Sequence, residues 1–171
     1  MNLQEAIKAA SPHTNKVDTV LAMTGLKITG GILYATDRYT AVRIEVPDTD
    51  DAWIPLSVAT QGILSISGNV ATLKTGATMN LPAQDEWPDY PTVEHLFEGF
   101  RPWSTGSPDP LAFGLAPAMF EKFLPRHFPR NAGAVKVEIG ETLAKPLRIT
   151  LLGFPEFVAL WVPVKITTDV R

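Results

Sequence analysis

Short apolar runs, rich in β-branched and aromatic residues and interrupted by glycine or proline, make up much of this 171-residue sequence. Runs of this length and composition are typical of β-strands, and the intervening glycines indicate turns. Three runs follow one another at 20–31, 32–39 and 40–47, separated by Gly30-Gly31 and by a polar cluster, Thr-Asp-Arg-Tyr, at 36–39. This punctuation predicts an antiparallel meander early in the chain.

Helical patterns occur as short segments that precede groups of strands. Residues 3–10 place their apolar side chains on one helical face, and Pro12 ends the pattern. Pro55 marks the start of a second helix, expected over 55–67, which follows a short strand and leads into a hairpin around Thr75-Gly76. Strand, helix and hairpin therefore form a second unit.

The last part of the chain repeats this order. Residues 83–110 hold five prolines and no regular period, which is typical of an ordered connector, with a boundary at 104–110. A strand at 111–117 and a helix over 117–128 come next. Three further strands are expected at 135–141, 146–153 and 157–166. The sequence thus predicts an α+β fold, with helices packed on antiparallel sheets in about three helix-and-sheet units.

Composition excludes several classes of protein. A chain of this length with 45% hydrophobic residues can form one compact domain, or two small ones that share a core. No apolar run approaches the roughly 20 residues that a membrane-spanning helix needs, and the first ten residues lack the features of a secretory signal. We therefore expect a cytoplasmic protein without a membrane partner. The absence of cysteine excludes disulfides, thiolate metal sites and cysteine nucleophiles.

The net charge of −3 is unevenly distributed along the chain. Residues 1–97 carry six Lys/Arg and eleven Asp/Glu, a balance of −5, whereas residues 98–171 carry nine and seven, a balance of +2. Non-specific DNA affinity depends on several phosphate contacts made from one face, so the charge balance alone leaves DNA binding open.

Familiar catalytic motifs are missing from the sequence. It contains no Gly-rich phosphate loop with Lys and Ser/Thr, no His-x-x-x-His pair and no Gly-x-Ser-x-Gly turn, and its three histidines are scattered. The acidic residues at 48–51 lack the Gly and the distant Glu of a calcium loop, which indicates a solvated turn. We expect neither enzymatic activity nor a bound metal or other cofactor.

The polar cluster at 36–39 permits two compatible interpretations. A Thr-Asp pair between strands is typical of a turn in which the Asp side chain accepts a hydrogen bond from a backbone amide. The surrounding segment, ATDRYTAVRIEV at 35–46, also resembles the Ala-Thr-Asp signature of the bacterial DNA polymerase III beta subunit, the sliding clamp. Three further segments resemble that family in the same order: IPLSVATQGI at 54–63, EWPDYPTV at 86–93 and LWVPVKI at 160–166.

The resemblance implies a shortened clamp, and its compactness is compatible with a phage-encoded form. Residues 1–93 resemble one clamp domain of two half units, residues 94–108 form a connector, and residues 109–171 resemble the closing half of the last domain. Clamps of this family are rings around duplex DNA, so the resemblance implies a homo-oligomer in a bacterial cell.

In that family, the Thr-Asp segment, the residue after the Pro-Asp-Tyr segment and the closing strand line one hydrophobic groove. The groove holds short peptides of polymerases, the clamp loader and repair proteins. The resemblance assigns these positions to Thr36, Arg38, Tyr39, Thr40, Ala41, Val93, Leu160, Val162 and Val164. Departures from the family's pattern at Ala41, Pro91-Thr92, Val162 and Val164 imply an altered or lost peptide preference. Trp161 and Trp87 are expected in the core or at a subunit contact.

Clamps also hold duplex DNA loosely, through basic side chains on helices that face the hole and contact phosphates without reading bases. The candidates here are Lys8 from the first helix and Lys122, Arg126 and Arg130 from the third helix and its exit. The second expected helix carries no charge. Ordinary solvated helix faces are the alternative interpretation of these basic residues.

Two functions are therefore compatible with the sequence. The first is a homo-oligomeric processivity factor that encircles duplex DNA and tethers DNA polymerase through the groove. The second is a clamp-like binding module that keeps the groove without forming a ring, and acts as an adaptor or as a competitor for clamp-binding partners.

Overall fold

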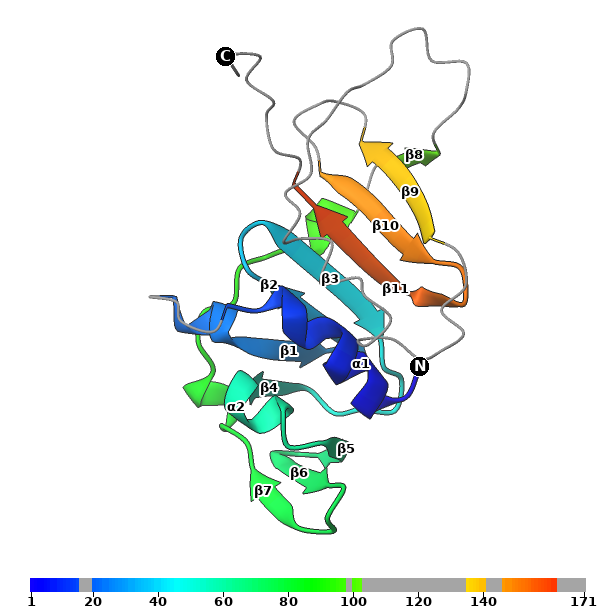
Figure 1. Ribbon diagram of the computed structural model, residues 1–171. Helices are drawn as coiled ribbons and strands as arrows, with labels where there is room; N and C mark the ends of the chain where they lie inside the picture. Colours follow the sequence, from blue (N-terminus) through cyan, green and yellow to red (C-terminus); the bar gives the residue numbers. More distant parts are fainter. Residues whose placement is uncertain (16–19, 98–99, 103–134, 141–145, 163–171) are drawn as a thin grey trace, which may run out of the picture.

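The computed structural model describes the 171-residue chain except for residues 16–19, 98–99, 103–134, 141–145 and 163–171. Its larger sheet is formed by β1 (Gly25–Thr29), β2 (Ile32–Thr36), β3 (Thr40–Glu45), β4 (Ala52–Pro55), β8 (Phe100–Pro102), β9 (Val135–Gly140), β10 (Leu147–Leu151) and β11 (Phe154–Trp161). The strand order is β4-β1-β2-β3-β11-β10-β9-β8 (Figure 1). All its pairs are antiparallel, which confirms the expected α+β class with antiparallel sheets.

The smaller sheet and the helices complete the described fold. The smaller sheet has the order β5 (Ile63–Ser67), β6 (Val70–Leu73) and β7 (Thr78–Asn80). The helices are α1 (Leu3–Ala10) and α2 (Leu56–Ala59), and the 3-10 turns are η1 (Ser11–His13), η2 (Leu21–Thr24), η3 (Gln84–Glu86) and η4 (Glu94–Phe97). Within the described ranges, no helix has the length and apolar character needed to span a membrane.

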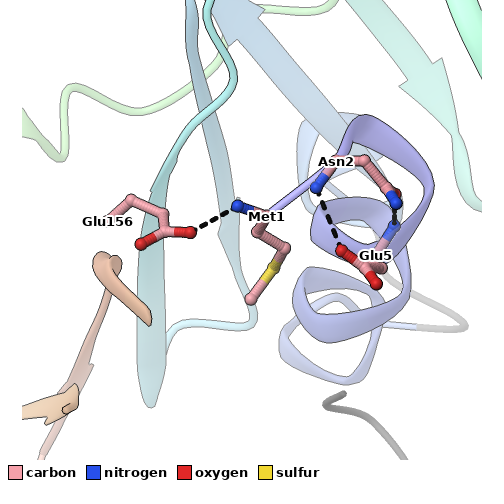
Figure 2. A network of polar contacts seen from close by, with 4 residues as sticks. All are labelled: Met1, Asn2, Glu5 and Glu156. Atoms are coloured by element: carbon pink, nitrogen blue, oxygen red, sulfur yellow. Dashed lines mark hydrogen bonds and ion pairs between the residues drawn. The ribbon is translucent and has the colours of Figure 1, made fainter. Parts of the chain in front are cut away.

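The first helix is fixed at its N-terminus by a reciprocal cap (Figure 2). The Asn2 side chain accepts a hydrogen bond from the Glu5 amide at 2.9 Å, and the Glu5 carboxylate accepts one from the Asn2 amide at 3.0 Å. These bonds satisfy two amides that have no partner within the helix. The buried amine of Met1 lies 2.5 Å from Glu156 Oε1, so an ion pair connects the start of α1 to strand β11.

Helix α1 lies across one face of the larger sheet, which we call the front face (Figure 1). Its apolar stripe is buried there, as the periodicity of residues 3–10 predicts. The buried residues of α1 are Leu3, Ala6, Ile7, Ala9 and Ala10. They share one core with residues of both sheets, because α1 also contacts β5. The helix therefore joins the two sheets.

Strand β11 is buried on both faces. Phe157, Ala159 and Trp161 belong to the front core, whereas Val158 and Leu160 pack on the opposite face, which we call the back face. This alternation follows from the two-residue period of a strand. Trp161 is only 2% exposed, which confirms the core position expected for it.

The meander expected over 20–47 is confirmed as β1, β2 and β3 in consecutive antiparallel order. The first run begins with the 3-10 turn η2 rather than with a strand. Gly30 and Gly31 connect β1 to β2 at φ values of +56° and +72°, a backbone region that glycine adopts without steric cost. The hairpin around Thr75-Gly76 is also confirmed, because β6 pairs with β7.

The second expected helix, over 55–67, is wrong in its length. Helix α2 covers only Leu56–Ala59, and Ile63–Ser67 forms strand β5 instead. Gly62, with φ +80°, lies between the two elements and interrupts the helix. Pairing with β6, together with burial of the isoleucines at 63 and 66, then stabilises the strand.

The strands expected near the C-terminus are present as β9, β10 and β11. Strand β11 begins at Phe154, three residues before the expected start. The expected strand at 111–117 and helix at 117–128 lie outside the described residues. Strand β8, within the expected connector, pairs with β9 at the edge of the larger sheet.

A close approach of β1 to β4 makes Gly25 sensitive to substitution. A Cβ atom at this position would lie 2.8 Å from the Ile54 carbonyl oxygen and from ring atoms of Trp53. We expect Gly25→Ala to lower the free energy of unfolding by about 1–3 kcal/mol in urea denaturation. Gly30→Asn is the control, because Gly30 faces open space and Asn tolerates positive φ; a change within about 0.5 kcal/mol is expected. Equal effects of the two substitutions would contradict this account.

Candidate functional site

The polar cluster between β2 and β3 is a tight turn organised by Asp37. Its Oδ1 atom accepts hydrogen bonds from the Tyr39 amide at 3.1 Å, from the Thr40 amide at 2.7 Å and from the Thr40 hydroxyl at 2.8 Å. The Thr36 hydroxyl donates to the Thr40 carbonyl at 2.9 Å. The expected role of the Asp side chain as a cap for backbone amides is thus confirmed.

Arg38 occupies a strained position at the tip of this turn. Its φ of +76° lies in the left-handed region, which costs a residue with a Cβ roughly 1–2 kcal/mol. The side chain extends over the surface, and its Nε atom lies 3.4 Å from Met23 Sδ. The capping bonds of Asp37 offset this cost and hold Arg38 and the exposed Tyr39 at the surface.

The hydroxyl of Thr40 connects the turn to a buried histidine on the front face. Because this hydroxyl donates to Asp37, its oxygen accepts a hydrogen bond from Nδ1 of His13 at 3.1 Å. His13 is fully buried in η1, and its ring lies 6.4 Å from that of Phe157. The sequence showed three scattered histidines and gave no sign that this one packs beneath the polar cluster.

An apolar cluster covers the back face where β2, β3 and β11 meet. We call it the back-face cluster; its buried members are Tyr34, Ala41, Val93, Phe97, Val158 and Leu160. Ala41 pairs directly with Leu160 across β3 and β11. Val93 immediately precedes η4 and Phe97 ends it, and the Phe97 ring lies 6.3 Å from that of Tyr34. Three segments distant in sequence therefore meet at this cluster.

Six of the predicted groove residues fall into two groups in the structure, and Arg38 lies at the exposed tip of the turn. Thr36, Ala41, Val93 and Leu160 are buried on the back face or at its end. Tyr39 and Val162 are exposed neighbours, because the Val162 amide donates to the Tyr39 carbonyl at 3.0 Å.

The other predicted site residues are separate from this cluster. Thr40 pairs with Trp161 and points to the front face, toward His13. Lys8 is exposed on α1. The positions of Val164, Lys122, Arg126 and Arg130 lie outside the described residues.

Three members of the back-face cluster, Tyr34, Phe97 and Val158, are not among the groove residues predicted from the sequence. Tyr34 and Val158 could have been found, because strand alternation places them on the same face as the predicted Ala41 and Leu160. Phe97 offered no comparable signal, since residues 83–110 show no period from which a buried face could be deduced.

Tyr34, within the back-face cluster, and Tyr90, packed against it, remain neutral phenols at physiological pH. Burial raises the pKa of Tyr90, and the nearby carboxylate of Glu94 raises it further. The same two causes raise the pKa of Tyr34. The Lys27 ammonium lies 5.6 Å from the centre of the Tyr90 ring, a distance typical of a cation–π contact.

A charged group borders the cluster on the side of β9 and β10. Glu138 is buried and lies 2.9 Å from Lys136 Nζ and 3.6 Å from Arg148 Nε. Arg148 in turn pairs across the sheet with Leu160. Lys136 and Arg148 both contact Glu138. Their two positive charges exceed the single negative charge of Glu138, so this border of the cluster has an excess of positive charge.

The acidic run at 48–51 caps neighbouring turns. Asp51 accepts hydrogen bonds from the Gly30 amide at 2.8 Å and from the Thr29 hydroxyl at 3.1 Å, and Asp50 accepts one from the Gly68 amide at 2.7 Å. Among the described residues, no group of three or more His, Asp or Glu side chains could hold a metal ion. The hydrogen bonds of Asp50 and Asp51 stabilise the turns that they cap.

The Thr40 hydroxyl is expected to stabilise the turn because both of its partners are buried or partly buried. Thr40→Val removes an acceptor from His13 and a donor from Asp37, and should lower the free energy of unfolding by about 1–3 kcal/mol. Thr29→Val is the matched control, because Thr29 makes the same type of bond to Asp51 at the exposed surface; a change below about 0.5 kcal/mol is expected. Urea denaturation of both variants measures the difference, and a Thr40→Val effect no larger than the control would disprove this role.

Comparison with known proteins relates this arrangement to one class of solved structure. The sequence matches no protein-family model, and no curated protein shows significant sequence similarity to it. The DNA polymerase sliding clamp from Bacillus subtilis superposes with a TM-score of 0.62 and 13% identity, over 96% of this chain and 62% of that one. The DNA polymerase III beta subunit from Thermotoga maritima superposes with a TM-score of 0.61 and 12% identity, over 98% of this chain and 64% of that one.

A third similar structure is a C. crescentus beta sliding clamp with polyethylene glycol bound to its putative beta-motif tethering region. It gives a TM-score of 0.60 and 10% identity, over 95% of this chain and 63% of that one. The chain thus spans less than two thirds of the length of each clamp. Nearly all of this chain nevertheless has a counterpart in them, and it has the fold of the bacterial DNA polymerase III beta sliding clamps.

Proposed function

We propose that this protein is a sliding-clamp-like processivity factor, a homo-oligomer that encircles duplex DNA and tethers DNA polymerase and other replication proteins. The observation that carries the proposal is the clamp fold over at least 95% of the chain in three similar structures. The meeting of the β2–β3 turn, the connector and β11 at the back-face cluster supports it, because these segments correspond to the groove segments of the family. The protein acts by tethering and needs no catalytic group.

The partner surface is the back-face cluster together with its exposed border. Tyr39 and Val162 supply apolar area at the surface, and Arg38 supplies a cation beside them. Recognition grooves for short peptides combine buried apolar contacts with a few polar groups that fix the orientation of the chain. Short peptides from polymerases and clamp-loader-type proteins are the partners of this surface.

Duplex DNA is held on the helical side of the assembly. Lys8 lies exposed on α1, and Lys122, Arg126 and Arg130 give the later part of the chain its positive balance. Contacts of these cations with phosphates are independent of base sequence and allow sliding.

A second candidate is a clamp-like binding module that forms no ring. It is favoured by helix α2, because Leu56–Ala59 carry no basic side chain that could contact phosphates. Such a module binds the same peptides and acts as an adaptor, or competes for clamp-binding partners. It differs from the first candidate in requiring neither oligomerisation nor DNA.

Substitution of the exposed groove residues tests the peptide surface. Val162→Asp and Tyr39→Ala should each abolish binding of a polymerase-derived clamp-binding peptide, because each removes apolar area from the proposed partner surface. Both side chains are exposed, so the fold should be preserved. Leu152→Asp is the matched control, because Leu152 is an exposed apolar residue in the turn after β10 and should leave affinity unchanged. Fluorescence anisotropy measures the affinity, and circular dichroism verifies the fold. Unchanged affinity in both groove variants would eliminate this surface.

Charge reversal tests the DNA-facing role separately. Arg126→Glu combined with Arg130→Glu should remove stimulation of a polymerase on long templates, because repulsion from phosphates replaces attraction. Peptide affinity should remain at the unmodified value, since the groove is formed by other residues. Lys74→Glu, at an exposed position after β6, is a control for a charge reversal outside the proposed DNA-facing residues, although it changes the net charge by −2 rather than −4. Stimulation that survives the double reversal would argue against a DNA-facing role for these arginines.

A further inference from the structure

The residues that would form the floor of the peptide groove are already covered. Leu160 is 2% exposed, Val93 4% and Ala41 5%, so a partner side chain cannot reach them in the described conformation. In contrast, Tyr39 and Val162, at the border, are 61% and 46% exposed. The border of the groove is therefore accessible, whereas its floor is not.

The aromatic ring of Phe97 is part of this cover. It belongs to the same apolar cluster as Leu160 and Ala41, lies 6.3 Å from the Tyr34 ring and is itself 7% exposed. Its neighbours in η4 are exposed, including Leu96. A single large side chain thus extends from an otherwise solvent-facing turn into the place where a partner's apolar side chain would pack.

We propose that Phe97 is an internal occupant of the peptide groove, and that a partner peptide binds by replacing it with a large apolar side chain of its own. This inference rests on the proposed peptide-binding function and adds a regulatory step to it. The chain competes with its partners for one apolar site. Its groove opens only when a partner, or another event that displaces η4, removes Phe97.

The size of η4 makes such an exchange feasible. It is a 3-10 turn of four residues, and turns of this kind are too short to persist without tertiary contacts. Its position therefore depends on the burial of Val93 and Phe97. A partner that buries an equivalent side chain compensates for the lost contacts, so the exchange costs little apolar burial overall.

Occupation of the groove lowers the apparent affinity for any partner. The apparent dissociation constant equals the intrinsic one divided by the fraction of molecules whose groove is open. If the closed state holds at least 90% of the molecules, removal of the internal occupant strengthens binding about tenfold or more. This gain distinguishes an occupied groove from an open one.

The test uses the chain's own segment as the probe. A labelled peptide of sequence PTVEHLF, copied from residues 91–97, is titrated against the full chain and against Phe97→Ala, with PTVEHLA as the control peptide. Phe97→Ala should bind PTVEHLF about tenfold or more tightly than the unmodified chain does, and should not bind PTVEHLA. Leu96→Ala, at the exposed neighbouring position, should behave like the unmodified chain. Equal affinity of the unmodified chain and Phe97→Ala, or no binding to Phe97→Ala, would overturn the inference.

A second measurement covers the case in which Phe97→Ala does not fold. The Leu96 amide donates to the Val93 carbonyl at 3.0 Å, so its hydrogen exchange reports whether η4 is in place. Saturating PTVEHLF should accelerate exchange at this amide in the unmodified chain. Exchange that is unchanged at saturation would overturn the inference without any substitution.

The same experiments separate this inference from the proposed function. A polymerase-derived peptide that binds the unmodified chain and Phe97→Ala equally well would contradict the internal occupant and leave the peptide-binding function intact. If PTVEHLF binds Phe97→Ala while polymerase-derived peptides bind neither protein, the internal occupant stands and the proposed partners are wrong.

Discussion

The pairing of β3 with β11 is the interaction on which the rest of the structure depends. It joins the N-terminal meander to the last strands of the chain in one sheet, with Ala41 opposite Leu160 and Thr40 opposite Trp161. Such a pairing between distant segments requires closure of a long loop, at an entropic cost that rises slowly with loop length. Burial of β11 on both faces offsets this cost, and the ion pair between Met1 and Glu156 adds a second connection to the same strand.

The two faces of this junction have different roles. On the front face, α1 and His13 pack against the sheet and fix the turn that carries Asp37. On the back face, the junction creates the apolar cluster where the proposed partner surface lies. Because Ala41 and Thr40 are adjacent in sequence but point to opposite faces, one strand supports both the stability of the turn and the formation of the candidate groove. The strained Arg38 at the tip is held by the same capping bonds.

Much of the sheet structure could be predicted from the sequence, because glycines and β-branched runs identify local turns and strands. The helix at 3–10, the meander and the hairpin at Thr75-Gly76 all follow from such local patterns. The sequence predicts too long a second helix, because the apolar residues at 63–67 fit either a helix or a strand. Pairing with β6 makes them a strand. Local pattern could not show the position of Phe97, because its burial depends on the packing of a connector without periodicity.

The most direct test of the clamp account is the mass of the protein in solution, measured by light scattering over a wide range of concentrations. A ring around duplex DNA requires a stable closed assembly, so the account predicts one multimer whose mass does not change on dilution and is a whole multiple of 18.6 kDa. A monomer at every concentration would contradict the ring and leave only the peptide-binding module.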